Sequence, residues 1–546
     1  MDAHGSQGTL ICGGRVFTAN TSAPWVEAVA VRGRRILGIG TEDELATRFP
    51  GYARLDIDGR TALPGLIDAH NHFLATGESL ASIDVRFPGA ASIDDVVARI
   101  ATAATIVPDG RAITAFGLND DKYGRSLTRR DLDRASTRHP IRVLHVSGHG
   151  VVVNSLTLER AGIGADVEDP PGGSFGRNAD GLLTGSCFDA AMQVVMPVAV
   201  DVGSHGPNFH VEIPLDEAVD AVERAGRAFL AAGLTTVCDA QTTRRELTAY
   251  RAAREQGRLP VRTVCMPLSN QLDGFRELGI VGPIGDDELR IGPLKIYADG
   301  SLIAGTASFD EPYGANGQLS GSMYHSPDDL ATLIQDAHAA GWQLGIHVQG
   351  DRAMRIVVDA LEAAIGRSPR DHRHRLEHAG YPTPPLIERI SALGLITVNQ
   401  PNYLFDSGDE FLEQLGERAH GLQPLRSELD AGIVVVLSSD SDVTSFRPLD
   451  TIQASIVRRT RDGAAIGPTE ALTLEQALHA HTMAAALAIG MEDRIGSLEP
   501  GKLADLTVID GDLERTPTDG LASLDVWMTM LGGRVGYAID PGIPVG

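Results

Sequence analysis

The sequence predicts an α/β protein built on a (β/α)8 TIM-like barrel, with a composite N/C-terminal β-sandwich and a cap insertion after the first barrel strand. Three observations favour this fold class. The chain has 546 residues, apolar strand-like runs in its middle are separated by helical patterns, and short β-like runs occur at both ends. An α/β barrel can exceed about 400 residues when it carries insertions. We therefore expect one large barrel with satellites and not several equal domains.

The two ends of the chain carry short alternating or apolar runs with turn signals, which are typical of antiparallel β-structure. At the start these runs include TLICGG, VEAVAVRG and RRILGIG, and near the end they include ADLTVIDGD, DVWMTMLGG and RVGYAID. We expect the two ends to complete one small β-sandwich, formed by residues 1–62 plus 488–546.

Between these ends, apolar strand runs alternate with helical patterns such as PLDEAVDAVERAGRAFLAAG. The candidate strands are 63–72, 234–241, 261–268, 294–301, 343–351, 373–380, 395–402 and 433–441. Eight βα units are what a closed barrel needs. We therefore assign residues 63–84 plus 216–487 to the barrel.

A long insertion separates the first two candidate strands. It carries strand-like runs of its own, RAITAFGLND and PIRVLHVSGHG, and it is too long for a simple loop. We expect residues 85–215 to form a cap that lies over the barrel mouth and contributes to substrate binding.

Composition restricts the partners of the protein. The formal net charge of −25 and the pI near 5.0 argue against nucleic acid or an anionic membrane surface, because phosphate binding depends on basic patches. The N-terminus lacks a basic region followed by an apolar run, and no apolar stretch of about 18 residues occurs. The four cysteines are widely spaced and form no CxxC pair. We expect a cytoplasmic protein that acts on a small molecule.

One lysine stands in a strand-like run. The chain has only three lysines, and Lys295 lies in LRIGPLKIYADGS, residues 289–301. Burying an ammonium group without a partner is costly, or it drives the amine towards neutrality. Three explanations remain open from the residues: an ion pair with Asp299, a Schiff-base nucleophile, or a carbamate that ligates metal.

Polar side chains gather at the C-terminal ends of the candidate strands, where barrels of this kind carry their chemistry. These residues are His70, His72, Lys295, His347, His378 and Asp440. The HxH pair places both imidazoles on one face of a strand, because strand side chains alternate. A lone His347 or His378 is more often a core histidine, so each signal is weak by itself. Together, the imidazoles and the carboxylate suit Zn²⁺ or a related divalent ion.

Lys295 fits the same set of ligands. A second metal near the first would need an anionic bridge, and the bridging water would then become a hydroxide near neutral pH. The carbamate of lysine offers two oxygens and a negative charge, which the ammonium does not. This interpretation leaves no buried cation without a partner.

These residues and their surroundings resemble a known family. The motifs are PGLIDAHNH, GHGVVVNSLTL, GPLKIYADGSL, IHVQGDRAM, HRLEHAG, SSDSDV and IGSLEPGKLADLTVIDGD. The chain is similar to the amidohydrolase superfamily, and within it to the N-substituted formamide deformylase-like and exoenzyme-regulation-like branch, amidohydrolase family 3. The resemblance covers essentially the whole chain.

The resemblance implies a function and a metal site. It implies a metal-dependent hydrolase of a non-peptide C–N bond in a small amide, N-substituted formamide or carbamate, with two Zn²⁺ bridged by carboxylated Lys295. His70, His72, Lys295 and Asp440 would hold one ion, and Lys295, His347 and His378 the other. Asp440 would act as general base and then as general acid towards the leaving nitrogen. We also expect a homodimer, because acidic barrels of this class commonly associate.

Four further residues are candidate substrate contacts: His149, Asn154, Asp299 and Arg375. An alternative stays open for each. His149 and Asn154 could instead hold a loop by hydrogen bonds, Asp299 could orient the metal ligands, and Arg375 could form a structural ion pair.

The chain departs from the family pattern at three positions. Val152 and Leu118 stand where tryptophan is usual, and Asp442 stands where proline is usual. The first two changes would enlarge or flatten the pocket, so the typical substrates of the branch need not apply. Asp442 would select a cationic group or simply be solvated.

Two other functions remain as rivals. A Schiff-base lyase would use Lys295 as nucleophile, but four histidines and Asp440 have no role in that chemistry. A non-catalytic regulator on a hydrolase fold would be expected to have lost metal ligands, and none of the six candidates is missing from the sequence.

Overall fold

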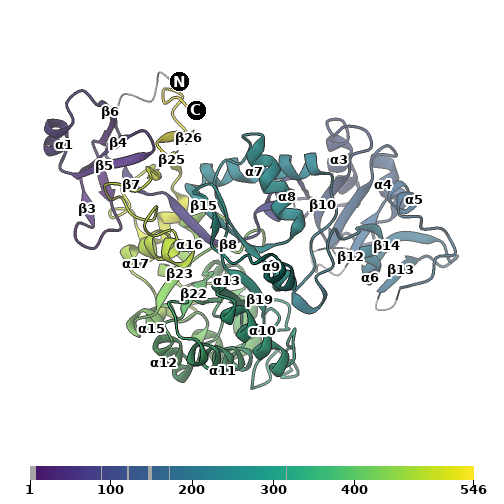
Figure 1. Ribbon diagram of the computed structural model, residues 1–546. Coiled ribbons are helices and arrows are strands. Elements are labelled where there is room, and N and C mark those ends of the chain that lie inside the picture. Colours follow the sequence, from purple (N-terminus) through teal and green to yellow (C-terminus); the bar gives the residue numbers. More distant parts are fainter. Residues whose placement is uncertain are drawn as a thin grey trace. The chain divides into compact units, whose positions relative to one another are not determined.

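The computed structural model describes residues 8–87, 89–119, 122–145, 150–170, 173–314 and 316–545 (Figure 1). The chain divides into two compact units. The large unit comprises Met1–Gly77, Val202–Pro207 and Val222–Gly546, and the small unit comprises Glu78–Asp201 and Asn208–Ala221. The small unit includes most of the expected cap, but our domain boundaries stay a prediction.

The two ends of the chain share a sheet within the large unit. Its six strands lie in the order β26 (Arg534–Ala538), β25 (Val526–Leu531), β24 (Leu506–Ile509), β7 (Thr61–Pro64), β2 (Arg15–Phe17) and β3 (Trp25–Val26). A second sheet has the order β5 (Arg35–Gly40), β4 (Ala28–Arg32), β1 (Thr9–Cys12) and β6 (Ala53–Asp56). One buried apolar cluster joins them, with Ile11 and Val29 from one sheet and Leu506 and Met528 from the other. Alternating apolar side chains therefore bring the two termini together.

Eight parallel strands follow the predicted runs. They are β8 (Leu66–Asn71), β15 (Leu234–Thr242), β16 (Arg262–Pro267), β19 (Leu294–Tyr297), β20 (Leu344–His347), β21 (Arg375–Glu377), β22 (Ile396–Asn399) and β23 (Val434–Leu437). Strand β8 begins after Gly65, and the part of the first predicted run before it belongs to β7 in the terminal sheet. The arrangement is TIM-barrel-like.

The eight strands form two sheets and not one continuous ladder. Strands β8, β15 and β16 belong to one sheet, and β19 to β23 form the other. Within the described residues, an isolated bridge between Leu268 and Lys295 links them on one side. On the other side, the amide of Asp440 donates to the carbonyl of His70 at 2.8 Å. The expected closed barrel is therefore not formed as an uninterrupted set of paired strands.

The stretch LRIGPLKIYADGS contains two strands where the sequence predicted one. Strand β18 (Leu289–Ile291) pairs with β16, and β19 pairs with β20 in the other sheet. Gly292 and Pro293 separate them, and proline cannot donate a hydrogen bond to a ladder. The seam between the two sheets therefore lies immediately before Lys295.

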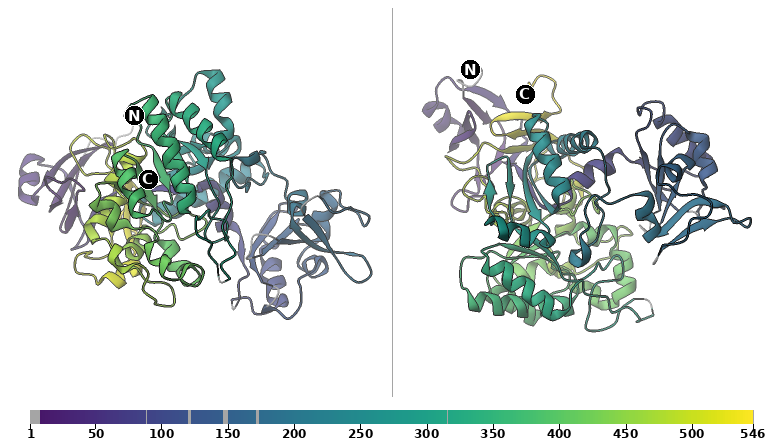
Figure 2. Two further views of the ribbon diagram at one scale, coloured as in Figure 1. Left: turned by 90° about the horizontal axis from the view of Figure 1, so that it is seen from below. Right: turned by 45° about the vertical axis from the view of Figure 1, so that its right-hand side comes forward.

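Helices cover the second sheet. Helices α10 (Pro327–Ala339), α11 (Asp351–Arg367) and α12 (Pro384–Ala392) lie side by side along it (Figures 1 and 2). Helix α11 buries Met354, Val357, Val358 and Leu361, whose spacing places them on one helix face. No helix in the described part of the chain combines the length and apolar character needed to cross a membrane.

The small unit contains a six-stranded sheet. Its order is β13 (Gly173–Arg177), β14 (Leu183–Asp189), β12 (Gly150–Val153), β11 (Ile141–His145), β10 (Ile113–Leu118) and β9 (Ile83–Asp84). Helix α3 (Ile93–Ala103) packs on it through Val96 and Ile100. The strand-like runs in the insertion therefore form a sheet of their own.

Candidate metal centre

Three strand ends bring His70, His378 and Asp440 together. One ligand atom from each lies within 4.8 Å of the other two. His70 belongs to β8, His378 directly follows β21, and Asp440 follows β23 by three residues. His70 Nε2 and His72 Nε2 lie 3.4 Å and 3.0 Å from Asp440 Oδ1, respectively. The geometry thus brings four of the six predicted ligands into one cluster.

His347 extends this cluster. It is the last residue of β20, and its ring centroid lies 4.4 Å from that of His378. Its Nε2 is 3.1 Å from the carbonyl oxygen of Gly300, which makes Nε2 the donor nitrogen. A neutral imidazole carries one proton, so Nδ1 of His347 keeps its lone pair for a ligand.

Lys295 is fully buried, and no salt bridge to it is formed within the described residues. Its side chain has 0% exposure, and its ammonium nitrogen has no hydrogen-bond partner among the described residues. Nζ lies 4.6 Å from the ring centre of Tyr297. Burial lowers the pKa of Lys295 to about 8, although the charges of Glu377 and Asp440 oppose this shift. At a given pH near neutrality, a larger fraction of Lys295 than of an exposed lysine is therefore the neutral amine, the form that adds CO₂.

The ion pair between Lys295 and Asp299, one of the three explanations that the sequence left open, is not formed. The carboxylate of Asp299 instead accepts backbone N–H groups from Ser308, Gln349 and Gly350, at 2.8, 3.0 and 3.0 Å. These contacts tie the loop after β19 to the loop after His347. Of the three explanations for Lys295, the salt bridge with Asp299 is therefore removed.

Several buried polar atoms fit a metal ion. His70 Nε2, Asp440 Oδ1 and Lys295 Nζ are buried and have no hydrogen-bond partner in the described part of the chain. Leaving such atoms without partners is unfavourable, and native proteins rarely do so. Imidazole nitrogens and a carboxylate oxygen are the donors that zinc and similar divalent ions accept. The residues present therefore match a divalent metal site.

Asp440 is held in an unusual conformation and an electropositive setting. Its φ is 55°, in the left-handed region that non-glycine residues seldom adopt. Burial alone would raise the pKa of Asp440, but the neighbouring His70 and His72 hold it well below its ordinary value. Conversely, burial alone would lower the pKa of His72, and Asp440 raises it. Asp440 is thus kept as a carboxylate at the centre of the cluster.

The family of the chain follows from comparison with known proteins. The amidohydrolase family profile matches residues 54–537. The chain belongs to the amidohydrolase family. This confirms the resemblance in the sequence and makes the protein a metal-dependent amidohydrolase, an enzyme class that acts on C–N bonds other than peptide bonds.

Individual relatives match this amidohydrolase along almost its whole length. It is 31% identical to N-substituted formamide deformylase of Arthrobacter pascens, over 97% of this chain and 98% of that protein. It is also 31% identical to Protein LONG AFTER FAR-RED 3 of Arabidopsis thaliana, over 97% and 91%. Uncharacterised metal-dependent hydrolases from Pyrococcus furiosus and Pyrococcus horikoshii superpose with TM-scores of 0.77 and 0.79, at 25% and 22% identity. The alignments cover 92% and 94% of this chain and 99% of each of those.

The residues predicted to contact substrate lie in varied settings. His149 lies outside the described residues. Asn154 caps helix α5 (Ser155–Arg160), accepts the amide of Thr157 at 3.0 Å and is fully buried. Arg375 is also fully buried and pairs with Glu377. The contacts of Asn154 and Arg375 are the loop and ion-pair alternatives that the sequence left open, whereas Asp299 bonds to backbone amides. A role in binding substrate stays a prediction for all four residues.

Three residues at the cluster were not selected from the sequence. Glu377 bonds to His70 Nδ1 at 2.5 Å, Gln400 Oε1 lies 2.8 Å from His378 Nδ1, and the hydroxyl of Tyr403 donates to Asp440 Oδ2. Glu377 stands within the motif HRLEHAG and alternates with Arg375, so the period of two could have indicated a shared face. Gln400 and Tyr403 follow β22. Their position after the end of a predicted strand was the only feature of the sequence that could have indicated a place at the site.

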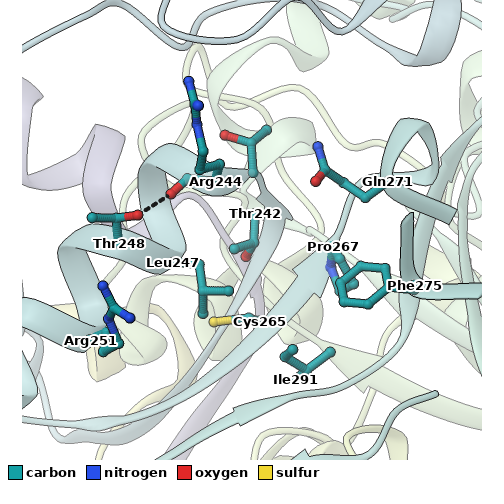
Figure 3. A pocket seen from close by; sticks show the side chains of 11 residues that line it. Thr242, Arg244, Leu247, Thr248, Arg251, Cys265, Pro267, Gln271, Phe275 and Ile291 are labelled. Atoms are coloured by element: carbon teal, nitrogen blue, oxygen red, sulfur yellow. Dashed lines mark hydrogen bonds between the residues drawn. The ribbon is translucent and has the colours of Figure 1, made fainter. Parts of the chain in front are cut away.

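A separate cavity lies between α8 (Arg244–Glu255), β16 and α9 (Leu272–Leu278) (Figure 3). Its volume is ≈320 Å³, and apolar side chains that include Leu247, Cys265 and Phe275 line it. None of the six predicted metal ligands belongs to its lining. The cavity is therefore distinct from the candidate metal centre.

Proposed function

We propose that this amidohydrolase cleaves the C–N bond of a small amide, N-substituted formamide or carbamate. The observation that carries the proposal is the buried cluster of His70, His378 and Asp440, whose ligand atoms lie within 4.8 Å of one another beside an unpaired lysine. The 31% identity to a protein named N-substituted formamide deformylase supports the choice of substrate class.

The proposed metal ligands are the six residues at the strand ends. These are His70, His72, Lys295, His347, His378 and Asp440, with Lys295 carboxylated and shared between two Zn²⁺ ions. A divalent ion held there would acidify a bound water and polarise the substrate carbonyl. Carboxylation would give Lys295 a negative charge and two oxygens for metal ions to bind, which would explain a buried lysine whose nitrogen has no hydrogen-bond partner among the described residues.

Asp440 is the proposed proton carrier. The oxygen of water forms a bond to the substrate carbonyl carbon, and Asp440 Oδ1 takes the proton that this water loses. The C–N bond then breaks, and Asp440 returns the proton to the leaving nitrogen, so that an acid and an amine are released. The Tyr403 hydroxyl donates to Oδ2 and thereby fixes the direction in which Oδ1 points.

The test combines metal analysis with hydrolysis of a substrate panel. The purified protein should contain about two divalent ions per chain, and mass spectrometry should find a gain of CO₂ on Lys295. A panel of N-substituted formamides, amides and carbamates should be hydrolysed, and a chelator should remove the activity. Lys295→Ala should be inactive, whereas Lys122→Ala, at an exposed lysine, should behave as wild type. Full activity in metal-free protein or in Lys295→Ala would contradict the proposal.

The same experiment distinguishes the rival functions. Trapping of a substrate on Lys295 by borohydride would favour the Schiff-base lyase. Metal binding without hydrolysis of any panel member would favour a non-catalytic regulator. We also propose a homodimer, which light scattering on the purified protein would test.

A further inference from the structure

Arg375 and Glu377 form a buried ion pair next to the candidate metal centre. Both side chains have 0% exposure. Arg375 Nε lies 2.7 Å from Glu377 Oε1, and Nη2 lies 2.9 Å from Oε2, so the contact is bidentate. Both oxygens of Glu377 thus accept from a guanidinium, which stays protonated and can only donate. Glu377 is therefore an acceptor without a proton of its own.

Glu377 determines which nitrogen of His70 carries the proton. Its Oε2 lies 2.5 Å from His70 Nδ1. An ionised carboxylate can only accept a hydrogen bond, so the proton of the neutral imidazole must sit on Nδ1. The other nitrogen, Nε2, then keeps its lone pair. It is this Nε2 that faces Asp440 Oδ1 at 3.4 Å and lacks a hydrogen-bond partner among the described residues.

The pair also fixes the backbone on both sides of the cluster. Arg375 Nη2 donates to the carbonyl oxygen of Ala69 at 2.8 Å, immediately before His70. Glu377 immediately precedes His378 on the chain. The pair thus contacts β8 in one sheet and belongs to β21 in the other. It holds together two strand ends that no ladder joins directly.

Gly345 leaves the space that this pair occupies. A Cβ at position 345 would lie 2.2 Å from the terminal methyl of Met266 and 2.7 Å from Glu377 Oε1. Both separations are shorter than real Cβ contacts allow, so a larger residue at position 345 would press on the Met266 methyl and on the Glu377 carboxylate. Glycine at this position of β20 therefore leaves room for the Glu377 carboxylate and for Met266 beside it.

We infer that Arg375 and Glu377 are a positioning pair that fixes the tautomer and ring orientation of His70 for metal binding. The inference rests on the proposed function, because it requires a metal at His70 Nε2. An ionised partner on the far nitrogen of a ligating imidazole also raises the basicity of the ligand. Neither residue touches the reacting atoms, so the pair acts through His70.

The experiment compares metal affinity in matched variants. Glu377→Gln removes the charge at nearly constant shape, and Glu428→Gln is the control, because Glu428 is equally buried but bonds to Thr397 and Asn399. Zinc affinity is measured by competition with a chromophoric chelator, alongside kcat and KM. We expect Glu377→Gln to lose about 10- to 100-fold in zinc affinity. Its kcat should fall while KM changes little, and the control should match wild type in both.

A double variant protects the test against misfolding. Glu377→Gln leaves the Arg375 guanidinium unpaired, so Arg375→Met with Glu377→Met removes both charges together. It should fold and show the same loss of zinc affinity. A folded variant of either kind with wild-type affinity, or a double variant that cannot fold, would overturn the inference and leave a purely structural pair. Wild-type protein that binds no divalent metal would overturn the proposed function as well.

Discussion

Glu428 is a buried acid whose protonation should make stability fall as the pH rises. Its side chain has 0% exposure, and Oε2 accepts from Thr397 Oγ1 at 2.7 Å and from Asn399 Nδ2 at 3.2 Å. Oε1 has no hydrogen-bond partner among the described residues. Burial without a cationic partner raises the pKa of Glu428 to about 8, from an ordinary value of 4.5.

The sign and size of the effect follow from this shift in pKa. Between pH 4.5 and about 8 the folded protein holds a proton at Glu428 that the unfolded chain has released. The contribution is fully present below pH 4.5 and is lost as the pH rises through the folded pKa. The folded and unfolded pKa values differ by about 3.5 units, which corresponds to about 5 kcal/mol of unfolding free energy when the whole range is titrated. Of this, about 3 to 4 kcal/mol falls between pH 5 and pH 8.

The assay is thermal unfolding of wild type and Glu428→Gln at pH 5, 6, 7 and 8. Glutamine reproduces the protonated acid without its titration, so the variant should lose less stability than wild type as the pH increases. The difference between the two unfolding midpoints should widen steadily towards pH 8. Parallel curves across this range would refute the reasoning, because they would show that Glu428 does not exchange its proton on unfolding.

Three further changes test other parts of the structure. Tyr403→Phe removes the hydroxyl that donates to Asp440, so kcat should fall by about 10- to 100-fold while the melting temperature stays near wild type. His338 Nδ1 lies 2.8 Å from His374 Nε2, and burial lowers the pKa of both, so the folded state binds fewer protons than the unfolded one. The stability contributed by the His338–His374 pair is therefore present above pH 6.5 and lost as the pH falls below it. The free energy of unfolding of His338→Gln should then fall less steeply than that of wild type as the pH is lowered. Gly345→Ala should weaken zinc binding and destabilise the protein by about 1 to 3 kcal/mol, because its Cβ would meet both the methyl of Met266 and the carboxylate of the positioning pair. Unchanged zinc affinity in that variant would contradict the role given to Gly345.

Much of the architecture was readable from periodicity. Each of the eight predicted strand runs overlaps a parallel strand, because a strand buried on both faces leaves a nearly continuous apolar run in the sequence. The seam before Lys295 was not predicted. An apolar pattern shows that a segment is a strand, but the pairing partner of β18 and β19 depends on which sheet edge lies nearby.

The chain by itself determined the set of chemical groups at the site, since alternation and strand order place His70, His378 and Asp440 at equivalent strand ends. It left open the roles of the polar residues that surround these groups. Only the tertiary structure paired Arg375 with Glu377, directed Asp299 to backbone amides and brought Tyr403 to Asp440. The physical reason is that a residue type fixes what a side chain can donate or accept, whereas the partner is fixed by contacts between segments far apart in the sequence.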